Sequence, residues 1–380
     1  MQVRSFGRLD WQVSALGFGV MRLPILEGDA GQIDEAEATR MVHYAIDHGV
    51  NYVDSAYGYH RGTSEAFLGR ALQGGYRERV KVATKMPCWL IKEPADFDKY
   101  LNEQLERLQD DRIDFYLLHA LGKEHWPTVR DYRVFDWAER AMADGRIGHL
   151  GFSFHDTFEL FQEIIDYYDH WAVAQIQYNY MDEEYQAGTR GLRYAAEKGL
   201  AVVVMEPIRG GTLARTPPEP ILDLWGGAQV RRSPAEWALR WVWNHPEVSV
   251  VLSGMSTMEH VVENIETAAT AEPGRLTADE LAIIGRVRDL YQELAPIPCT
   301  GCEYCLPCPS GVKIPRIFEL YNEAIMYNDL RPSRMRYSWL KDEERASVCV
   351  ACGSCEELCP QAIAIIEWLA RSHELLAPEP

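Results

Sequence analysis

Short apolar runs alternate with amphipathic stretches along residues 1–270 of the chain. The apolar runs lie at 16–21, 52–54, 80–85, 113–119, 149–153, 172–178, 201–206 and 249–253. Between them, apolar residues recur at helical spacing over 35–48, 64–72, 94–109, 128–143, 157–168, 186–198, 233–244 and 258–269. Strands that alternate with helices predict a parallel sheet, and eight such units over about 260 residues fit a (β/α)8 TIM barrel.

The segments that flank this pattern define the domains. Residues 1–14 alternate weakly and predict a β-hairpin. Residues 209–232 are rich in Gly and Pro, and we expect a long loop there, which in a barrel is usually functional or mobile. One more helix is expected over 276–291. The α/β chain is therefore expected to have a barrel over 1–292 and a small, mainly helical domain over 293–380.

The second domain holds eight of the nine cysteines, in the runs CTGCEYCLPCP and CVACGSCEELCP. They are Cys299, Cys302, Cys305 and Cys308 in the first run, and Cys349, Cys352, Cys355 and Cys359 in the second. Such bunching favours metal or cluster ligation over disulfides. Thiolates also bind zinc, but zinc sites usually show two separated pairs. The second run has the bacterial ferredoxin spacing, so iron–sulfur clusters are favoured over zinc.

Charge and hydropathy exclude two classes of partner. The chain carries 57 acidic and 38 basic residues, a net charge of −19, which argues against nucleic-acid binding. No apolar run of about 18 residues and no signal-type N-terminal segment occurs. We therefore expect a soluble, cytoplasmic protein with no membrane partner.

Three consecutive predicted strands end in ionisable residues. Asp54, Lys85 and His119 end the second, third and fourth strands, and Tyr59 lies on the loop after Asp54. Active sites of (β/α)8 barrels lie at the C-terminal strand ends, so we expect the four side chains to meet. A lysine ammonium lowers the pKa of a nearby tyrosine by favouring the phenolate. Tyr59 is therefore a candidate general acid or base, and Asp54 is expected to keep Lys85 charged and in place.

These four residues resemble the tetrad of the aldo-keto reductases in order and approximate spacing. The whole chain is similar to a bacterial and archaeal group of that family that has a C-terminal ferredoxin-like domain. The resemblance implies hydride transfer between NAD(P)H and a small-molecule carbonyl or alcohol. Tyr59 would be the general acid in reduction and the base in oxidation, and His119 would orient the carbonyl oxygen. The resemblance also implies a hairpin that plugs the barrel's bottom. It also implies nicotinamide contacts at Ser153 and Gln175 and adenine contacts at Glu263 and Asn264. Arg209, on the long loop, is expected to meet the pyrophosphate.

The chain departs from this family at two cofactor positions. Met205 stands where the family often stacks an aromatic ring on the nicotinamide. Members that prefer NADP usually place Lys or Arg around 254–260 to bind the 2′-phosphate, whereas SGMSTMEH supplies neither. Because a phosphate dianion is best bound by Arg or Lys, NAD and NADP both remain open.

The cysteine runs resemble a two-cluster ferredoxin, in which the fourth cysteine of each run ligates the other cluster. One 4Fe-4S cluster would be held by Cys299, Cys302, Cys305 and Cys359, and a second by Cys349, Cys352, Cys355 and Cys308. Clusters transfer single electrons whereas nicotinamide transfers a hydride, and no flavin fingerprint is present.

Three functional hypotheses follow from the two domains. The first is a nicotinamide-dependent carbonyl reductase whose clusters are structural or serve docking. The second is a redox relay that receives electrons from a ferredoxin-like partner. The third, an electron-transfer or scaffold subunit with a degenerate barrel, is disfavoured by the intact tetrad.

Overall fold

The computed structural model describes residues 1–299, 301, 304–359 and 361–377. Packing divides the chain into two compact units. The first comprises Met1–Ala214 and Arg232–Thr277, and the second comprises Arg215–Arg231 and the residues from Ala278 onward. Helix α11 (Ala278–Leu294) therefore groups with the cysteine-bearing part of the chain. The domain boundary expected after residue 292 stays a prediction.

The first unit is a closed barrel of eight parallel strands, which confirms the predicted fold class. Its strands are β3 (Leu16–Gly19), β4 (Tyr52–Asp54), β5 (Lys81–Met86), β6 (Ile113–Leu121), β7 (Ile147–Phe154), β8 (Val173–Gln177), β9 (Ala201–Met205) and β10 (Val248–Ser253). They pair in chain order, and β10 closes the barrel against β3. Nearly continuous burial along each strand fits a sheet covered on both faces.

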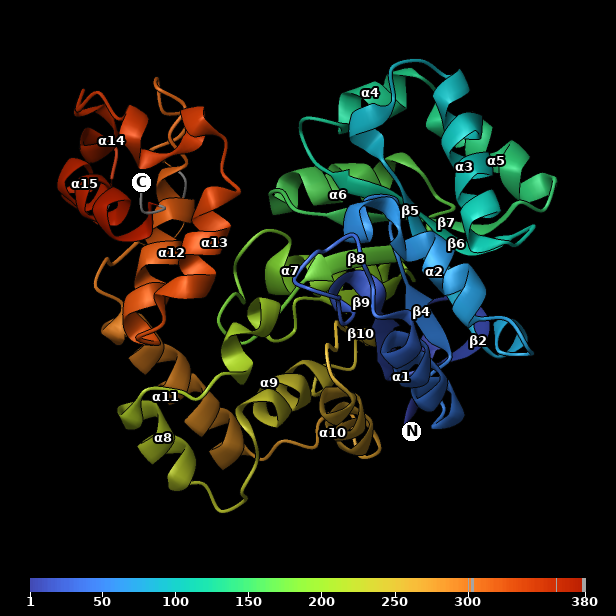
Figure 1. The fold of residues 1–380 in the computed structure, drawn as a ribbon, viewed down its shortest axis with the longest axis horizontal. Helices are drawn as coiled ribbons and strands as arrows, with labels where there is room; N and C mark the ends of the chain where they lie inside the picture. The colour runs from blue at the N-terminus through green and yellow to red at the C-terminus, as the bar shows by residue number, and fades with distance from the viewer. Residues whose placement is uncertain (300, 302–303, 360, 378–380) are drawn as a thin grey trace. The chain divides into compact units, whose positions relative to one another are not determined.

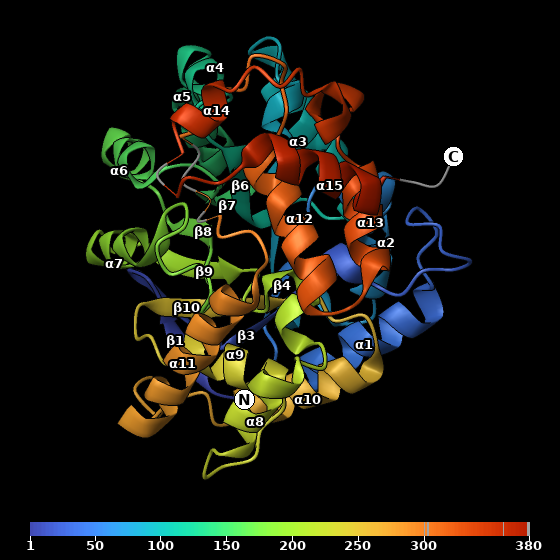
Figure 2. The same cartoon turned by 90° about the vertical axis from the view of Figure 1, so that its left-hand side faces the viewer.

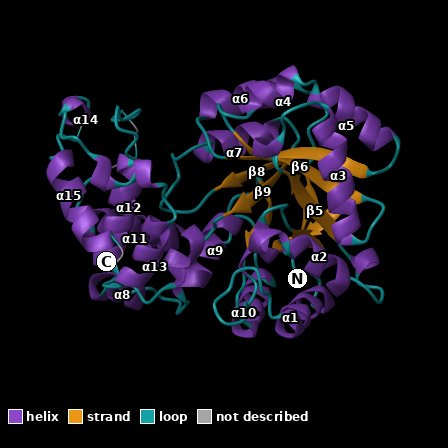
Figure 3. Ribbon diagram, turned by 45° about the horizontal axis from the view of Figure 1, so that its top comes forward, coloured by secondary structure: helices purple, strands orange, loops and turns teal. Residues whose placement is uncertain are grey.

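A ring of helices surrounds these strands (Figures 1 and 3). The helices are α1 (Glu35–Asp47), α2 (Ser64–Ala71), α3 (Ala95–Leu108), α4 (Trp126–Asp131), α5 (Val134–Ala143), α6 (Phe158–Tyr167), α7 (Gly188–Glu197), α9 (Pro234–Trp243) and α10 (Met258–Ala268). The first and last of them, α1 and α10, lie side by side and complete the ring (Figure 2).

Two predicted segments differ from the structure. The single helix expected over 128–143 is the pair α4 and α5, because Arg133 between them has a left-handed φ of 59° that a right-handed helix cannot contain. The long loop expected over 209–232 contains a helix, α8 (Glu219–Gly226), with Pro220 in its first turn, where the missing amide hydrogen costs nothing.

The N-terminal hairpin plugs the bottom of the barrel, as the family resemblance implied. Strands β1 (Val3–Phe6) and β2 (Leu9–Ser14) pair antiparallel. Phe6 and Val13 join the core cluster inside the barrel. The Arg8 backbone N–H donates to the Gly199 carbonyl, just before β9 begins. This plug leaves the opposite, C-terminal end of the strands for a functional site.

The described residues of the second unit form helices joined by loops, with no strand among them, which confirms the prediction of a mainly helical region. Its helices are α8, α11, α12 (Ile314–Met326), α13 (Leu330–Ser338), α14 (Ser354–Glu357) and α15 (Ile365–Leu376). Its core includes Phe318, Leu320, Tyr337 and Leu369. No helix in the described ranges of either unit is long and apolar enough to span a membrane.

Candidate active site

The tetrad assembles at the C-terminal ends of three neighbouring strands. Asp54 ends β4, while Lys85 and His119 lie on β5 and β6. The Lys85 Nζ donates to Asp54 Oδ1 at 2.6 Å and to the Ser55 carbonyl at 2.7 Å. It also lies 3.3 Å from the Tyr59 hydroxyl. The Tyr59 and His119 rings meet edge to face with centroids 6.1 Å apart. All four predicted side chains therefore face one another.

Burial controls the electrostatics of this cluster. Lys85 is 1% exposed and Asp54 is 3% exposed. Burial alone would lower the pKa of Lys85, but Asp54 and Tyr59 outweigh that effect and the pKa is raised. Lys85 is therefore a charged ammonium held by a carboxylate.

The phenol of Tyr59 departs from the sequence-based expectation. We expected Lys85 to lower its pKa, and Lys85 does act in that direction. Burial disfavours the phenolate more strongly, however, and the pKa of Tyr59 is raised above its usual value. Tyr59 consequently keeps its proton at neutral pH, as a general acid must.

An irregularity in β6 places His119. The pairing of β6 with β7 shifts between Leu118 and Leu121, and Ala120 has a left-handed φ of 51°. The Ala120 N–H donates to Ser153 Oγ at 2.8 Å, so a side chain of β7 supports this turn. Burial, with the nearby charge of Lys85, holds the pKa of His119 well below its usual range. A neutral imidazole therefore faces the site.

The surroundings of His119 include one exposed aromatic ring and one buried thiol. The Trp89 ring lies 5.0 Å from the His119 ring, and Trp89 is 43% exposed. Cys88 beside it is buried, and burial raises the pKa of its thiol to about 12. Trp89 is thus placed to contact a substrate, whereas Cys88 has the properties of a small core residue.

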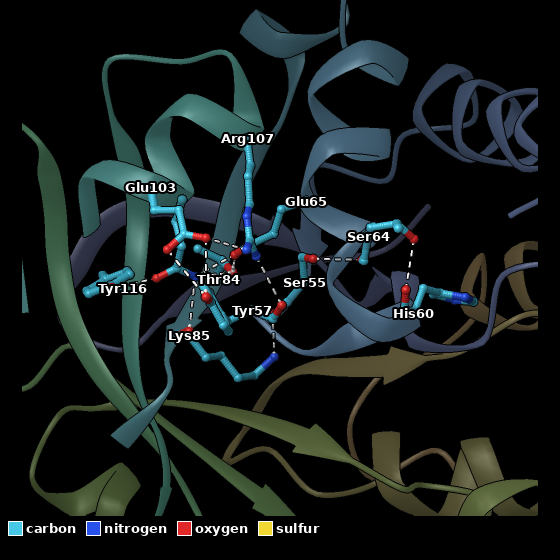
Figure 4. Close-up of polar contacts among 12 residues, drawn as sticks. Ser55, Tyr57, His60, Ser64, Glu65, Thr84, Lys85, Glu103, Arg107 and Tyr116 are labelled. Carbon is cyan, nitrogen blue, oxygen red and sulfur yellow. Dashed lines mark hydrogen bonds and ion pairs between the residues drawn. The ribbon is translucent and has the colours of Figure 1, made fainter. Parts of the chain in front are cut away.

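A polar network that the sequence did not reveal supports β5 from its outer face. Figure 4 shows Glu65, Thr84 and Arg107 pointing toward one another from α2, β5 and α3. The fully buried Glu65 accepts from Thr84 Oγ1 at 2.6 Å and from Arg107 at 3.2 Å. Gln104 donates to Glu65 and, at 3.1 Å, to the Lys85 carbonyl. Because successive strand residues point to opposite faces, Thr84 anchors the outside of the strand whose next residue is Lys85.

Two predicted nicotinamide contacts lie side by side in the barrel. Ser153 on β7 and Gln175 on β8 are paired residues and are both buried. The Gln175 Nε2 lies 3.5 Å from Asp54 Oδ2. Its Oε1 is buried and has no hydrogen-bond partner among the described residues. A buried, unpaired acceptor is costly unless a ligand satisfies it, and the carboxamide NH2 of a nicotinamide would do so.

The other predicted cofactor residues make contacts within the protein. Asn264 Nδ2 donates to Ser253 Oγ at 2.9 Å and ties α10 to the end of β10. Glu263 accepts from the Ser233 hydroxyl. Arg209 Nε lies 3.3 Å from Asp182 Oδ2. The predicted adenine and pyrophosphate roles of these residues stay predictions.

Six of the described cysteines lie in or against the core of the second unit. Cys355 is buried in this core, and Cys299, Cys305, Cys308, Cys349 and Cys359 pack against it. None of the seven described cysteines of the two runs forms a disulfide. Cys302, an expected ligand, lies outside the described residues. Within the described ranges, no three His, Cys, Asp or Glu side chains converge closely enough to hold a metal ion. Cysteines in this spacing, gathered around one core, suit iron–sulfur ligation.

Two sequence profiles match the chain. That of the aldo/keto reductase family matches residues 15–223, and that of the 4Fe-4S dicluster domain matches residues 298–364. The chain is 27% identical over 298 residues to an L-galactose dehydrogenase of Arabidopsis thaliana, which covers 74% of this chain and 91% of that protein. It is also 27% identical over 285 residues to a 6-dehydroglucose reductase of Novosphingobium aromaticivorans, which covers 69% of this chain and 89% of that protein.

Solved structures share the barrel. The holo form of an aldo-keto reductase from Bacillus halodurans matches with a TM-score of 0.62 and 28% identity, over 76% of this chain and 96% of that one. An aldo-keto reductase from Klebsiella pneumoniae, solved in complex with NADPH, has the same fold with a TM-score of 0.60 and 24% identity, over the same shares of the two chains.

Proposed function

The chain belongs to the aldo/keto reductase family and carries a 4Fe-4S dicluster domain, and we propose that it interconverts a carbonyl and an alcohol with a nicotinamide cofactor. The observation that carries this proposal is the buried chain of contacts from Asp54 through Lys85 to the Tyr59 hydroxyl. An ion pair this deeply buried costs desolvation energy, so its position beside a phenol at the C-terminal strand ends favours a catalytic role.

Each residue of the tetrad has a separate role in the proton transfer to the carbonyl oxygen. The cofactor, when bound, supplies a hydride to the carbonyl carbon. Tyr59 donates its proton to the carbonyl oxygen, and the Lys85 ammonium stabilises the phenolate that this step leaves. Asp54 keeps that ammonium charged at 2.6 Å. His119, neutral because it is buried, donates a hydrogen bond to the same oxygen and orients it.

The cofactor would be held by residues already on the barrel. The unpaired Oε1 of Gln175 would accept from the carboxamide of the cofactor, and Ser153 is its strand partner on β7. Two relatives are named for sugar substrates, an L-galactose dehydrogenase and a 6-dehydroglucose reductase. A polyhydroxylated carbonyl or alcohol is therefore the substrate class that we propose to test first.

The Tyr59→Phe variant tests the acid–base assignment. Removing a positioned general acid costs about 10²–10⁴-fold in rate, so we expect kcat to fall by that factor while dinucleotide affinity is unchanged. Tyr76→Phe is the matched control, because its hydroxyl bonds to Asp47 on the exposed surface. Full carbonyl reductase activity in Tyr59→Phe would refute the assignment.

A second function, the redox relay, draws support from the dicluster match at residues 298–364. In it, two 4Fe-4S clusters on the eight cysteines would exchange electrons with a ferredoxin-like partner. Anaerobic protein would be mixed with NADH or NADPH while cluster absorbance and EPR are followed. Bleaching by either nucleotide would favour the relay, and reduction by dithionite alone would favour a self-contained reductase.

A further inference from the structure

Two consecutive residues at the start of α2 bond to the segments that hold the Lys85 ammonium. They are Ser64 and Glu65, and both are fully buried. The Ser64 hydroxyl lies 2.9 Å from the Ser55 hydroxyl, and Figure 4 shows the two facing each other. The Ser55 carbonyl in turn accepts from the Lys85 ammonium at 2.7 Å. Ser64 therefore ties α2 to the residue after β4 that holds the ammonium.

Gln104 on α3 connects Glu65 to the backbone of Lys85. Its Nε2 donates to Glu65 Oε1 and, at 3.1 Å, to the Lys85 carbonyl. Its Oε1 accepts from the Tyr116 hydroxyl on β6 at 2.6 Å. Gln104 is fully buried, so a rotation of its amide would leave buried donors and acceptors unpaired. The bonds on both ends of this amide therefore fix the Lys85 backbone.

The turn between Tyr59 and α2 fixes the phenol relative to the same helix. Residues 60–62 have successive left-handed φ values of 49°, 54° and 91°, and two of the three carry a Cβ. Such a backbone is costly and persists only where the surrounding structure holds it. One short segment therefore carries the phenol and, through Glu65, contacts the network that holds Lys85.

The function of Lys85 depends on its distance from the phenol. The Lys85 Nζ lies 3.3 Å from the Tyr59 hydroxyl. At so short a distance the attraction between an ammonium and a phenolate falls steeply as the two separate. Burial, Asp54 and Tyr59 are the main influences on the pKa of Lys85. The network around Glu65 would thus act on the ammonium through its position rather than through its charge.

We propose that Glu65 and Gln104 are positioning residues that hold the Lys85 ammonium against the Tyr59 hydroxyl. The inference rests on the proposed function, because that function gives the contact its role in proton transfer. Glu65 and Gln104 act on the outer face of β5, through the backbone of Lys85. Their bonds keep the ammonium close to the phenol while the proton leaves and returns in each turnover.

Two variants loosen this anchor. Gln104→Met keeps the size of the side chain and removes its bonds to Glu65 and to the Lys85 carbonyl. Glu65→Gln introduces an amide nitrogen that would face either Arg107 or Gln104, donor against donor. In both variants we expect the ammonium to move away from the phenol. A separation that grows by about 1 Å from 3.3 Å would raise the midpoint of the Tyr59 titration by about 0.9 pH units, for an effective dielectric constant of about 20.

Two measurements would detect this change. The pH at which the rate of alcohol oxidation rises should move up by the same amount, because Tyr59 acts there as a base. Carbon-13 NMR of protein labelled at the tyrosine Cζ would report the phenol directly, with the Tyr59 signal assigned by its absence from Tyr59→Phe. Glu103→Gln is the matched control: Glu103 bonds to Arg107 and to the Tyr57 hydroxyl rather than to β5, so neither measurement should change.

Three outcomes would overturn the proposal or its basis. Reduced stability of Gln104→Met and Glu65→Gln with both measurements unchanged would show that the network is purely structural. An equal change in Glu103→Gln would assign the effect to the pairing of Arg107 instead. If the unmodified protein oxidises no alcohol with NAD or NADP, the proposed function fails; the NMR signal then decides the positioning role by itself, and an unchanged Tyr59 signal in both variants would refute it. Far-UV circular dichroism would verify that each variant is folded.

Discussion

The Asp54→Asn variant would remove the carboxylate from the buried ion pair at the centre of the site. Asn has nearly the same shape as Asp, so the packing around β4 is preserved. Lys85 is 1% exposed and donates to Asp54 Oδ1 at 2.6 Å, so its ammonium would lose the anion that offsets its burial. Two contacts of Lys85 remain, to the Ser55 carbonyl and to the Tyr59 hydroxyl.

Removing one partner of a buried pair costs about 3–5 kcal/mol, because the other charge stays buried and uncompensated. We therefore expect Asp54→Asn to lower the free energy of unfolding by about this amount, unless Lys85 releases its proton. Burial acts to lower the pKa of Lys85, and Asp54 is the largest influence that raises it, so the pKa should drop when Asp54 is replaced. Loss of that proton would place the result near the lower end of the range. In that case activity would fall as well, because Tyr59 would lose its neighbouring cation.

The double variant Asp54→Asn/Lys85→Met separates the ion pair from the packing. Replacing both charges often leaves stability nearly unchanged, so the double variant should recover about 2 kcal/mol or more relative to Asp54→Asn, without recovering activity. Urea unfolding followed by circular dichroism would give the free energies. Amide hydrogen exchange on peptides that cover β4 and β5 would show whether the change is local to the barrel.

Two results would refute this reasoning. A loss below about 1 kcal/mol in Asp54→Asn would place the pair among weak, solvated ion pairs. Equal stability of the single and double variants would show that the uncompensated ammonium is not the source of the cost.

Two further predictions concern His60 and the cysteines. The His60 ring holds the turn after Tyr59, with Nε2 accepting from the Leu23 N–H at 3.2 Å and Nδ1 donating to the Ala30 carbonyl at 2.9 Å, and burial lowers its pKa. The unfolded chain protonates His60 below about pH 6.5, whereas the folded chain resists this, so the free energy of unfolding should fall as the pH drops below that value. In His60→Gln it should fall less steeply with pH. Equal pH slopes of the unfolding free energy, measured with urea, would contradict this. Cys355 is an expected cluster ligand in the core of the second unit, so Cys355→Ser should lower the iron content of anaerobically purified protein. Cys88 is also buried but lies in the barrel and is no expected ligand, so Cys88→Ser should leave the iron content unchanged. Unchanged iron in Cys355→Ser, or zinc in place of iron, would contradict the cluster assignment.

The sequence alone was sufficient for the architecture and for the location of the tetrad. Apolar runs that alternate with helical periodicity determine a parallel barrel, and neighbouring parallel strands end at one face. Asp54, Lys85 and His119 could therefore be placed together from their positions at strand ends. The spacing of the cysteines indicated cluster ligation, and the match to a dicluster domain bears out that class of module.

Only the tertiary structure decided what surrounds these residues. The pKa of Tyr59 depends on burial competing with the charge of Lys85, and burial cannot be read from the residue types. The contact of Glu65 with Thr84 and Arg107 joins three elements across the outer face of β5. Local patterns specify the elements and the ends at which they meet, whereas charge, burial and side-chain partners depend on which elements the closed barrel brings into contact.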